Sequence, residues 1–173
     1  MKSFTEISPA QMDENIFKLI GSDWMLVTAQ KPDGSFNTMT ASWGGAGVLW
    51  NKNVVFCFIR PQRYTFSFAE STNALTFSFF DESCRDALRI CGSKSGRQID
   101  KCEATGLKPV RERDYVWFEQ ARLVLQCRIL YKDDLKKSCF LDDSLLSNYQ
   151  EIDYHRMYVC EIEHVRKAVD DKS

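Results

Sequence analysis

The stretch DWMLVTAQKPDGSFNTMTASWGG, residues 23–45, indicates a β-hairpin early in the chain. Residues 23–30 are typical of a strand and residues 36–44 of the returning strand, with KPDGS as the turn between them. Gly34 can supply the positive φ that such a turn needs. The returning strand is unusual, because small or hydroxylated side chains occupy positions 38, 40, 41 and 42. One explanation is a wall at which the backbone and hydroxyl groups come close to a bound ligand.

The rest of the chain predicts more strands and only short helices. Strands are expected at residues 53–59, 74–80 and 156–165, with two more inside 115–132. Helices are expected at residues 8–21, from Pro61 onward, from Glu82 to Cys91, in a turn closed by Gly106, and around 142–149. A doubly wound sheet needs a helix after nearly every strand. We therefore predict a mainly β protein, a β-barrel with short helices, formed as a single domain by residues 1–173.

Composition excludes several classes of partner. The chain has 23 basic and 24 acidic residues, so it lacks the basic excess of a nucleic-acid-binding protein. No apolar run approaches the roughly 18 residues of a membrane span, and the first residues lack the apolar segment of a secretion signal. The seven cysteines form no CxxC pair, which with two histidines argues against a metal site. Reduced thiols in a cytoplasmic protein are the simpler interpretation, with several buried as small hydrophobic residues.

Two basic stretches could bind an anion. In RPQRYT, residues 60–65, the two arginines and Thr65 stand at a predicted strand end and helix start. In GSKSGRQIDK, residues 92–101, small residues around Lys94 and Arg97 would let backbone amides approach a phosphate, although the Walker spacing is absent. The alternatives are solvated arginines at an ordinary helix start, and a helix C-cap followed by an exposed loop.

Candidate catalytic residues are few. His155 precedes the last predicted strand, and a lone histidine is more often a surface or satisfied core residue than a catalytic one. No serine has the GxSxG context of a hydrolase nucleophile. Among the cysteines only Cys91, beside the basic loop, is a weak candidate nucleophile.

Taken together, the motifs resemble the flavin reductase-like family of FMN-binding split-barrel proteins, which includes flavoredoxins. The resemblance extends over roughly residues 8–165 and depends on the order and spacing of five stretches. These are PAQMDENIFKLIGSDWMLVTA, NTMTASWGG, FCFIRPQRYTFSF, SGRQIDK with the later GL, and the ending with His155 and VCEI. It implies a split barrel that forms a homodimer, with FMN near the subunit interface.

The resemblance also implies roles for individual residues. The TMTAS segment would lie along the isoalloxazine and ribityl chain, Gly44 and Gly45 would turn the chain away, and Trp43 would either cover a ring or pack in the core. Arg60 or Arg63, or both, would hold the phosphate together with Thr65. The cofactor-binding residues expected on this basis are Thr38, Met39, Thr40, Ala41, Ser42, Trp43, Arg60, Arg63, Tyr64, Thr65, Ser95, Gly96, Arg97 and Lys101. His155 would lie on the nicotinamide side, although Cys160 and Ile162 replace the glycine and valine that many members have near it.

The expected function is an FMN-binding oxidoreductase that takes a hydride from NADH or NADPH onto flavin N5 and passes electrons on. Neither nucleotide is favoured, because no Rossmann motif is present. The first alternative is a flavoredoxin-like carrier that keeps FMN bound and exchanges electrons with a redox protein partner. The second is a flavin-free barrel that binds a small ligand or a protein.

Overall fold

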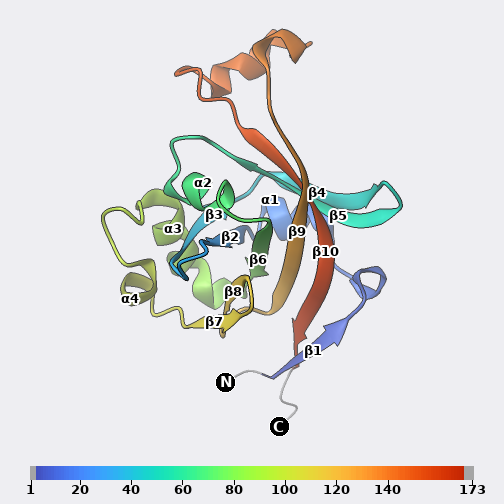
Figure 1. The fold of residues 1–173 in the computed structure, drawn as a ribbon, viewed down its shortest axis with the longest axis vertical. Coiled ribbons are helices and arrows are strands. Elements are labelled where there is room, and N and C mark those ends of the chain that lie inside the picture. The colour runs from blue at the N-terminus through green and yellow to red at the C-terminus, as the bar shows by residue number, and fades with distance from the viewer. Residues whose placement is uncertain (1–2, 170–173) are drawn as a thin grey trace.

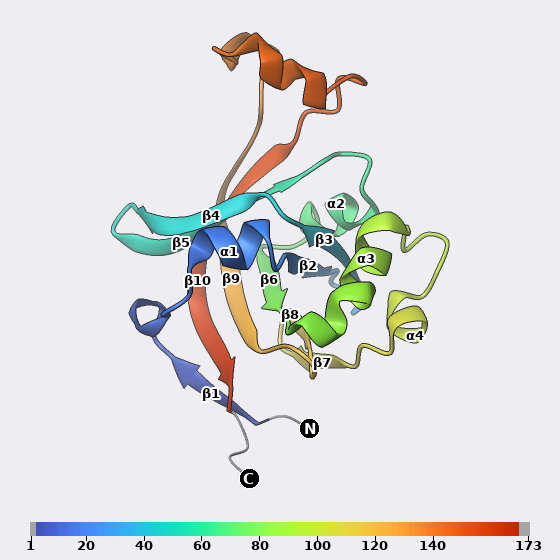
Figure 2. The ribbon, with the colours of Figure 1, turned by 180° about the vertical axis from the view of Figure 1, so that it is seen from behind.

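The computed structural model describes residues 3–169, which form a strongly curved antiparallel sheet with short helices around it (Figures 1 and 2). The eight-stranded sheet has the order β3-β2-β6-β9-β10-β5-β4, and β1 pairs with β10. Its strands are β1 (Phe4–Ile7), β2 (Met25–Gln30), β3 (Phe36–Ala41), β4 (Gly44–Leu49), β5 (Lys52–Ile59), β6 (Ala74–Phe79), β9 (Leu123–Asp134) and β10 (Arg156–Ala168). A small second sheet consists of β7 (Pro109–Glu112) and β8 (Tyr115–Phe118). The predicted mainly β architecture is therefore confirmed.

The hairpin expected at the start of the chain is present. β2 and β3 pair from Met25 opposite Ala41 to Gln30 opposite Phe36. The turn between them closes with a hydrogen bond from the Lys31 amide to the Ser35 carbonyl, 2.8 Å, and Gly34 has a φ of 83°. The left-handed conformation at Gly34 is the one that the sequence predicts.

The apolar side chains divide into two clusters on opposite faces of the sheet. β2 shows the division, because Val27 belongs to the cluster enclosed by the curved sheet and Leu26 to the cluster on its other side. The second cluster is covered by α3 (Arg85–Ser93) and by the β7–β8 sheet. Four cysteines are buried as small hydrophobic residues, as predicted: Cys57, Cys91, Cys127 and Cys160. The double burial makes β2 and β3 a rigid wall between two packed layers.

Two predicted helices begin later than expected. The segment 8–21 contains a 3-10 turn, η1 (Pro9–Gln11), and a separate helix, α1 (Ile16–Gly21), which Asn15 caps by accepting from the Lys18 amide. The helix expected from Pro61 is α2 (Tyr64–Ala69), and residues 60–63 form a turn closed by a 3.0 Å bond from the Arg63 amide to the Arg60 carbonyl. That turn leaves Arg63 at the N-cap of α2 in an extended conformation.

The helical segments after β6 follow the prediction more closely. Glu82–Cys84 forms a 3-10 turn, η2, that leads into α3. The next helix, α4 (Lys101–Thr105), is capped by the Asp100 side chain and ends at Gly106 with a φ of 71°. The segment around 142–149 contains a 3-10 helix, η4 (Asp143–Asn148), after the shorter η3 (Lys137–Cys139). The left-handed Gly106 is the helix stop that the sequence predicts.

Gly44 and Gly45 do not turn the chain away, so that expectation is wrong. Both belong to β4 and pair with Cys57 and Phe56 of β5. A Cβ on Gly44 would lie 2.5 Å from the Phe56 carbonyl oxygen, which shows that close strand approach is why glycine stands there. The reversal comes later, at Trp50 and Asn51, whose φ angles are 53° and 57°.

An arm between β9 and β10 extends from the barrel. β10 begins at Arg156, opposite Asp134 of β9 and Ile59 of β5, and residues 135–155, with η3 and η4, extend away from the rest of the molecule (Figures 1 and 2). The arm returns to the barrel at His155, immediately before β10. Within residues 3–169, no helix has the length and apolarity needed to cross a membrane.

Candidate functional site

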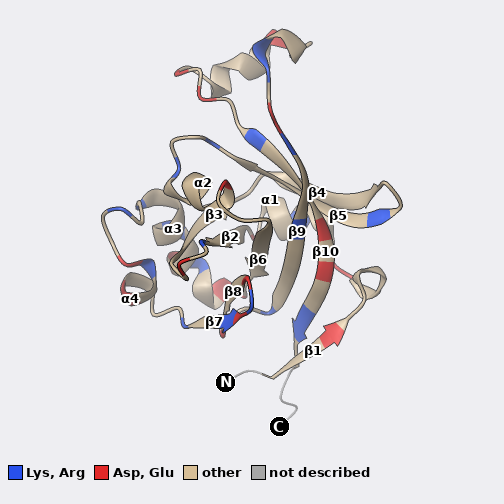
Figure 3. Ribbon diagram, in the orientation of Figure 1, with Lys and Arg blue, Asp and Glu red and all other residues tan. Residues whose placement is uncertain are grey.

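The candidate site lies where β3 passes the start of α2 and the loop after α3. A polar cavity of about 120 Å³ opens there. Its wall consists of Asn37, Met39, Gln62, Arg63, Tyr64, Thr65, Gly92, Ser93, Lys94, Ser95, Gly96 and Lys101. Basic residues occur both on the β5–α2 connection and on the α3–α4 segment, which face the site from two sides (Figure 3).

Three buried polar side chains form the floor of this cavity. The Lys101 ammonium donates to the carbonyl oxygens of Thr38, at 2.7 Å, and Cys91, at 2.8 Å. Asn37 donates through Nδ2 to the Thr65 hydroxyl at 2.7 Å. Burial is the main reason that the pKa of Lys101 is lowered to about 8, and repulsion from the nearby Arg63 contributes to the shift. An ammonium with three donors and two carbonyl partners keeps one donor for another acceptor.

Arg63 is the only arginine or lysine of the cavity wall that is both half-buried and without a hydrogen bond or ion pair among residues 3–169. Burial, followed by repulsion from Arg60, lowers the pKa of its guanidinium. Desolvating a cation without a partner is costly, so this position favours the arrival of an anion.

Gly96 allows the 95–97 loop to close on the site. A Cβ at this position would lie 2.1 Å from Asn37 Oδ1 and 3.1 Å from the Tyr64 ring. Arg97 is not in the cavity wall; its guanidinium stacks over the Tyr64 ring at 4.6 Å and donates to the Gln62 carbonyl. The loop is thereby held against the start of α2.

A second cavity of about 190 Å³ adjoins the first and shares Met39 and Arg63 with it. It is lined by Met39, Thr40, Ala41, Ser42, Trp43, Phe58, Arg60, Arg63 and His155. Trp43 and Phe58 flank His155, with ring centroids at 5.2 and 6.4 Å. The two cavities thus run from a polar, cationic end to an aromatic end.

The two arginines that the sequence could not tell apart have different surroundings. Arg60 forms an ion pair with Asp153 and donates through Nη2 to the Asn148 carbonyl at 2.9 Å, so it holds the arm. Arg63 has no such partner among the described residues. Of the two, Arg63 is therefore the one available to a ligand.

Two predicted hydroxyl groups are used within the protein. The Thr38 hydroxyl pairs with that of Thr28 at 2.9 Å, and the Thr40 hydroxyl donates to the Leu88 carbonyl of α3. Thr38 lines neither of the two cavities, whereas Thr40 borders the second one through the rest of its side chain. These threonines hold β3 to its neighbours.

Apart from Thr38 and Arg97, every site residue expected from the sequence lines one of the two cavities. Asn37 was missed, because an asparagine at the end of a strand resembles a turn former. Its position in a predicted strand, where a polar side chain needs a buried partner, was the available signal. Cys91 is poorly suited to act as a nucleophile, because burial raises the pKa of its thiol to about 11 and so disfavours the reactive thiolate.

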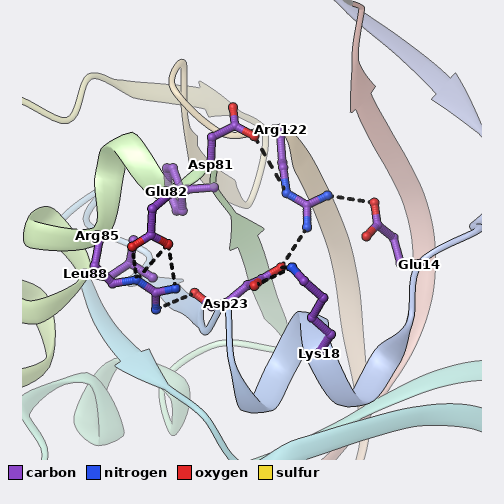
Figure 4. Close-up of a pocket in the computed structure, with 9 residues that line it drawn as sticks. Glu14, Lys18, Asp23, Asp81, Glu82, Arg85, Leu88 and Arg122 are labelled. Atoms are coloured by element: carbon purple, nitrogen blue, oxygen red, sulfur yellow. Dashed lines mark hydrogen bonds and ion pairs between the residues drawn. The ribbon is translucent and has the colours of Figure 1, made fainter.

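Another cavity, of about 410 Å³, lies between α1, η2 and α3 and is filled with opposite charges (Figure 4). Arg122 contacts Glu14 at 2.7 Å and Asp23 at 3.3 Å, and Lys18 also pairs with Asp23. Arg85 pairs with Glu82. Since each charged group of this cavity lies beside an opposite charge within residues 3–169, the cavity ties α1 to the sheet and offers no unpaired group there to a ligand.

Three solved structures show the same fold. A flavin reductases-like FMN-binding domain from Shewanella baltica matches with a TM-score of 0.69 and 12% identity, over 96% of this chain and 78% of that one. Flavoredoxin of Desulfovibrio vulgaris matches with a TM-score of 0.67 and 17% identity, over 95% of this chain and 78% of that one. The flavin reductase of styrene monooxygenase from Pseudomonas putida matches with a TM-score of 0.63 and 9% identity, over 86% of this chain and 80% of that one.

Sequence comparison gives the family directly. A comparison with curated proteins finds no match. The family model described as a flavin reductase like domain matches residues 17–173, which is most of the chain. The neighbours confirm the split-barrel fold that the sequence motifs indicate. The chain therefore belongs to the flavin reductase-like family of FMN-binding split-barrel proteins.

Proposed function

We propose that this chain, as one domain over residues 1–173, binds FMN and acts as a flavin-dependent oxidoreductase. The observation that carries the proposal is the half-buried, unpartnered guanidinium of Arg63 at the junction of the two cavities. A phosphate ester is the kind of anion that an arginine in this setting binds best.

The residues present fit the cofactor. The cationic cavity, with Arg63, Thr65, Ser95 and the remaining donor of Lys101, suits the phosphate. The aromatic cavity, with Ala41, Ser42 and Trp43, suits a flat ring. Their order matches a molecule that is charged at one end and planar at the other. Gly96 supports the fit, because a side chain there would collide with Asn37.

When bound, FMN supplies hydride chemistry, accepting a hydride at N5 from NADH or NADPH and passing the electrons on. The chain's own residues provide binding and electrostatics. Arg63 and Lys101 contribute positive charge beside the ligand, which favours an anionic form. Trp43 and Phe58 give the ring cavity an aromatic wall. His155, at its rim, is neutral at pH 7 because burial lowers its pKa to about 4.

We also propose a homodimer that places this site near the subunit interface. An apolar cavity of about 620 Å³ between α1 and β4 shares Ser42 and Trp43 with the ring cavity. Beside it, Phe17 is 89% exposed. A second copy on this face would bury Phe17 and extend the wall of the ring cavity. The seven free cysteines fit a reducing, cytoplasmic compartment.

A flavoredoxin-like electron carrier is the second candidate. A carrier needs an exposed ring edge, and Trp43 at the mouth of the ring cavity is 47% exposed. The test is the visible spectrum of the FMN-loaded protein after anaerobic NADH, then NADPH, then dithionite. Rapid bleaching with either nucleotide supports the reductase, and bleaching with dithionite alone supports the carrier. A protein that takes up no FMN contradicts both and leaves a flavin-free barrel.

A further inference from the structure

His155 closes the ring cavity from the arm side. It is 8% exposed and lies at the start of β10, where the arm returns to the barrel. Its Nδ1 lies 2.9 Å from the Tyr149 hydroxyl. Its Nε2 has no hydrogen-bond partner among residues 3–169, and this atom is not fully buried. Because His155 lines the cavity, Nε2 is the ring nitrogen left open to a ligand.

The arm holds Tyr149 rigidly in this position. Tyr149 is 8% exposed and packs in an aromatic cluster, with its ring centroid 4.9 Å from that of Tyr154 and 5.7 Å, edge-on, from that of Phe140. Arg60 lies over the same ring at 5.3 Å and binds Asp153 and the Asn148 carbonyl on either side of it. The phenol is therefore held by packing and by an ion pair, independently of its bond to His155.

The groups around the Tyr149–His155 pair favour one direction for the hydrogen bond between them. Burial raises the pKa of Tyr149, so its hydroxyl keeps its proton at pH 7. Within residues 3–169, His155 Nδ1 is the one acceptor that the hydroxyl reaches. A buried hydroxyl donates where it can, so Tyr149 donates and Nδ1 accepts. A neutral imidazole whose Nδ1 accepts carries its proton on Nε2.

We propose that Tyr149 is a positioning residue that holds His155 as the Nε2–H tautomer, so that His155 donates a hydrogen bond to a carbonyl oxygen of the ligand in the ring cavity. The acceptor is a neutral carbonyl on a planar ring, which both the flavin and a nicotinamide carboxamide possess. The choice of the flavin and the nicotinamide as sources of this carbonyl rests on the proposed function. The assignment of the His155 tautomer does not depend on that function.

The tautomer is tested on the flavin-free, full-length protein by long-range ¹H–¹⁵N NMR of the imidazole nitrogens. The chain has only two histidines, so His155→Gln assigns the signals. Wild type is expected to show a protonated Nε2 and an accepting Nδ1 at pH 7. Tyr149→Phe keeps the ring and removes the hydroxyl, and is expected to give a mixture of tautomers. A protonated Nδ1 in wild type overturns the proposal.

The matched control is Tyr154→Phe. Tyr154 belongs to the same aromatic cluster, and its hydroxyl makes no hydrogen bond among the described residues. Its removal is expected to leave the His155 signals unchanged. A change in Tyr154→Phe equal to that in Tyr149→Phe would assign the effect to packing and contradict the proposal.

Ligand measurements then identify the carbonyl. If the flavin carbonyl is the acceptor, Tyr149→Phe weakens FMN binding about three- to tenfold. If the carboxamide is the acceptor, FMN binding is unchanged and the KM for NADH or NADPH rises by a similar factor. If Tyr149→Phe changes neither FMN binding nor the KM for NADH or NADPH, the proposal is contradicted. Failure of wild type to bind FMN would reject the proposed function while the NMR result stands.

Discussion

Replacing Arg63 with methionine is the substitution that examines the site most sharply. The guanidinium is half-buried, lines both cavities and lacks a partner among residues 3–169. A charge-assisted hydrogen bond contributes roughly 1.5–3 kcal/mol, so Arg63→Met should weaken FMN binding about ten- to a hundredfold. Flavin fluorescence titration against flavin-stripped protein measures the change directly.

The same substitution should not destabilise the flavin-free protein. Methionine keeps most of the apolar stem and removes a desolvated charge that Arg60 repels. Urea unfolding without FMN should therefore give an equal or higher midpoint for Arg63→Met than for wild type. Loss of ligand affinity together with unchanged or greater stability is the signature of a binding residue rather than a structural one.

Two controls define the outcome. Arg89→Met makes the same change of charge at an exposed position on α3, paired with Asp86, and should leave FMN binding unchanged. Arg60→Met should weaken FMN binding less than Arg63→Met, because Arg60 is engaged with Asp153 and the Asn148 carbonyl. Tight binding by Arg63→Met, or a larger loss in Arg60→Met, would refute the assignment.

Three further changes have defined outcomes. Gly96→Ala should weaken FMN binding and raise flavin release in stopped-flow fluorescence, since its Cβ would fall 2.1 Å from Asn37 Oδ1; an unchanged release rate would contradict the close approach. FMN affinity should fall as pH rises from 7 to 9.5, because Lys101, with its pKa of about 8, loses its charge, and Lys101→Met should abolish that dependence. His155 should make the protein sensitive to acid: its folded pKa of about 4 lies below the unfolded value, so the unfolded chain takes up the proton first and stability falls as pH drops from about 6.5 to 4. Between these pH values the free energy of unfolding, measured with urea, should fall by about 2–3 kcal/mol. If His155→Gln loses the same amount over the same pH range, the loss does not come from His155.

Local signals in the sequence predict the parts of the fold that local chemistry determines. The turn at Gly34 and the helix stop at Gly106 need a positive φ, and glycine supplies it in both places. The same reasoning fails at Gly44, where the reason for glycine is the approach of another strand, 12 residues away in sequence at Phe56. Proximity of that kind is decided by tertiary structure and leaves no local pattern.

The candidate site divides in the same way. The stretches 37–45, 60–65 and 92–101 could be singled out by composition, and the fold brings residues of all three together around the two cavities. The separate roles of Arg60 and Arg63 could not be predicted, because they depend on the arm, where Asp153 lies more than 90 residues later in the chain. Tyr149 could not be identified from the sequence for the same reason, because the fold of the arm is what brings its hydroxyl to His155 Nδ1.

The most direct test of the account is a titration of the purified, flavin-stripped protein with FMN, followed by flavin fluorescence and the visible spectrum. We predict quenching that saturates at one FMN per chain and a shifted flavin spectrum, with Arg63→Met requiring about ten- to a hundredfold more FMN. Fluorescence that stays equal to that of free FMN at every concentration would contradict the central claim that these two cavities form a flavin site.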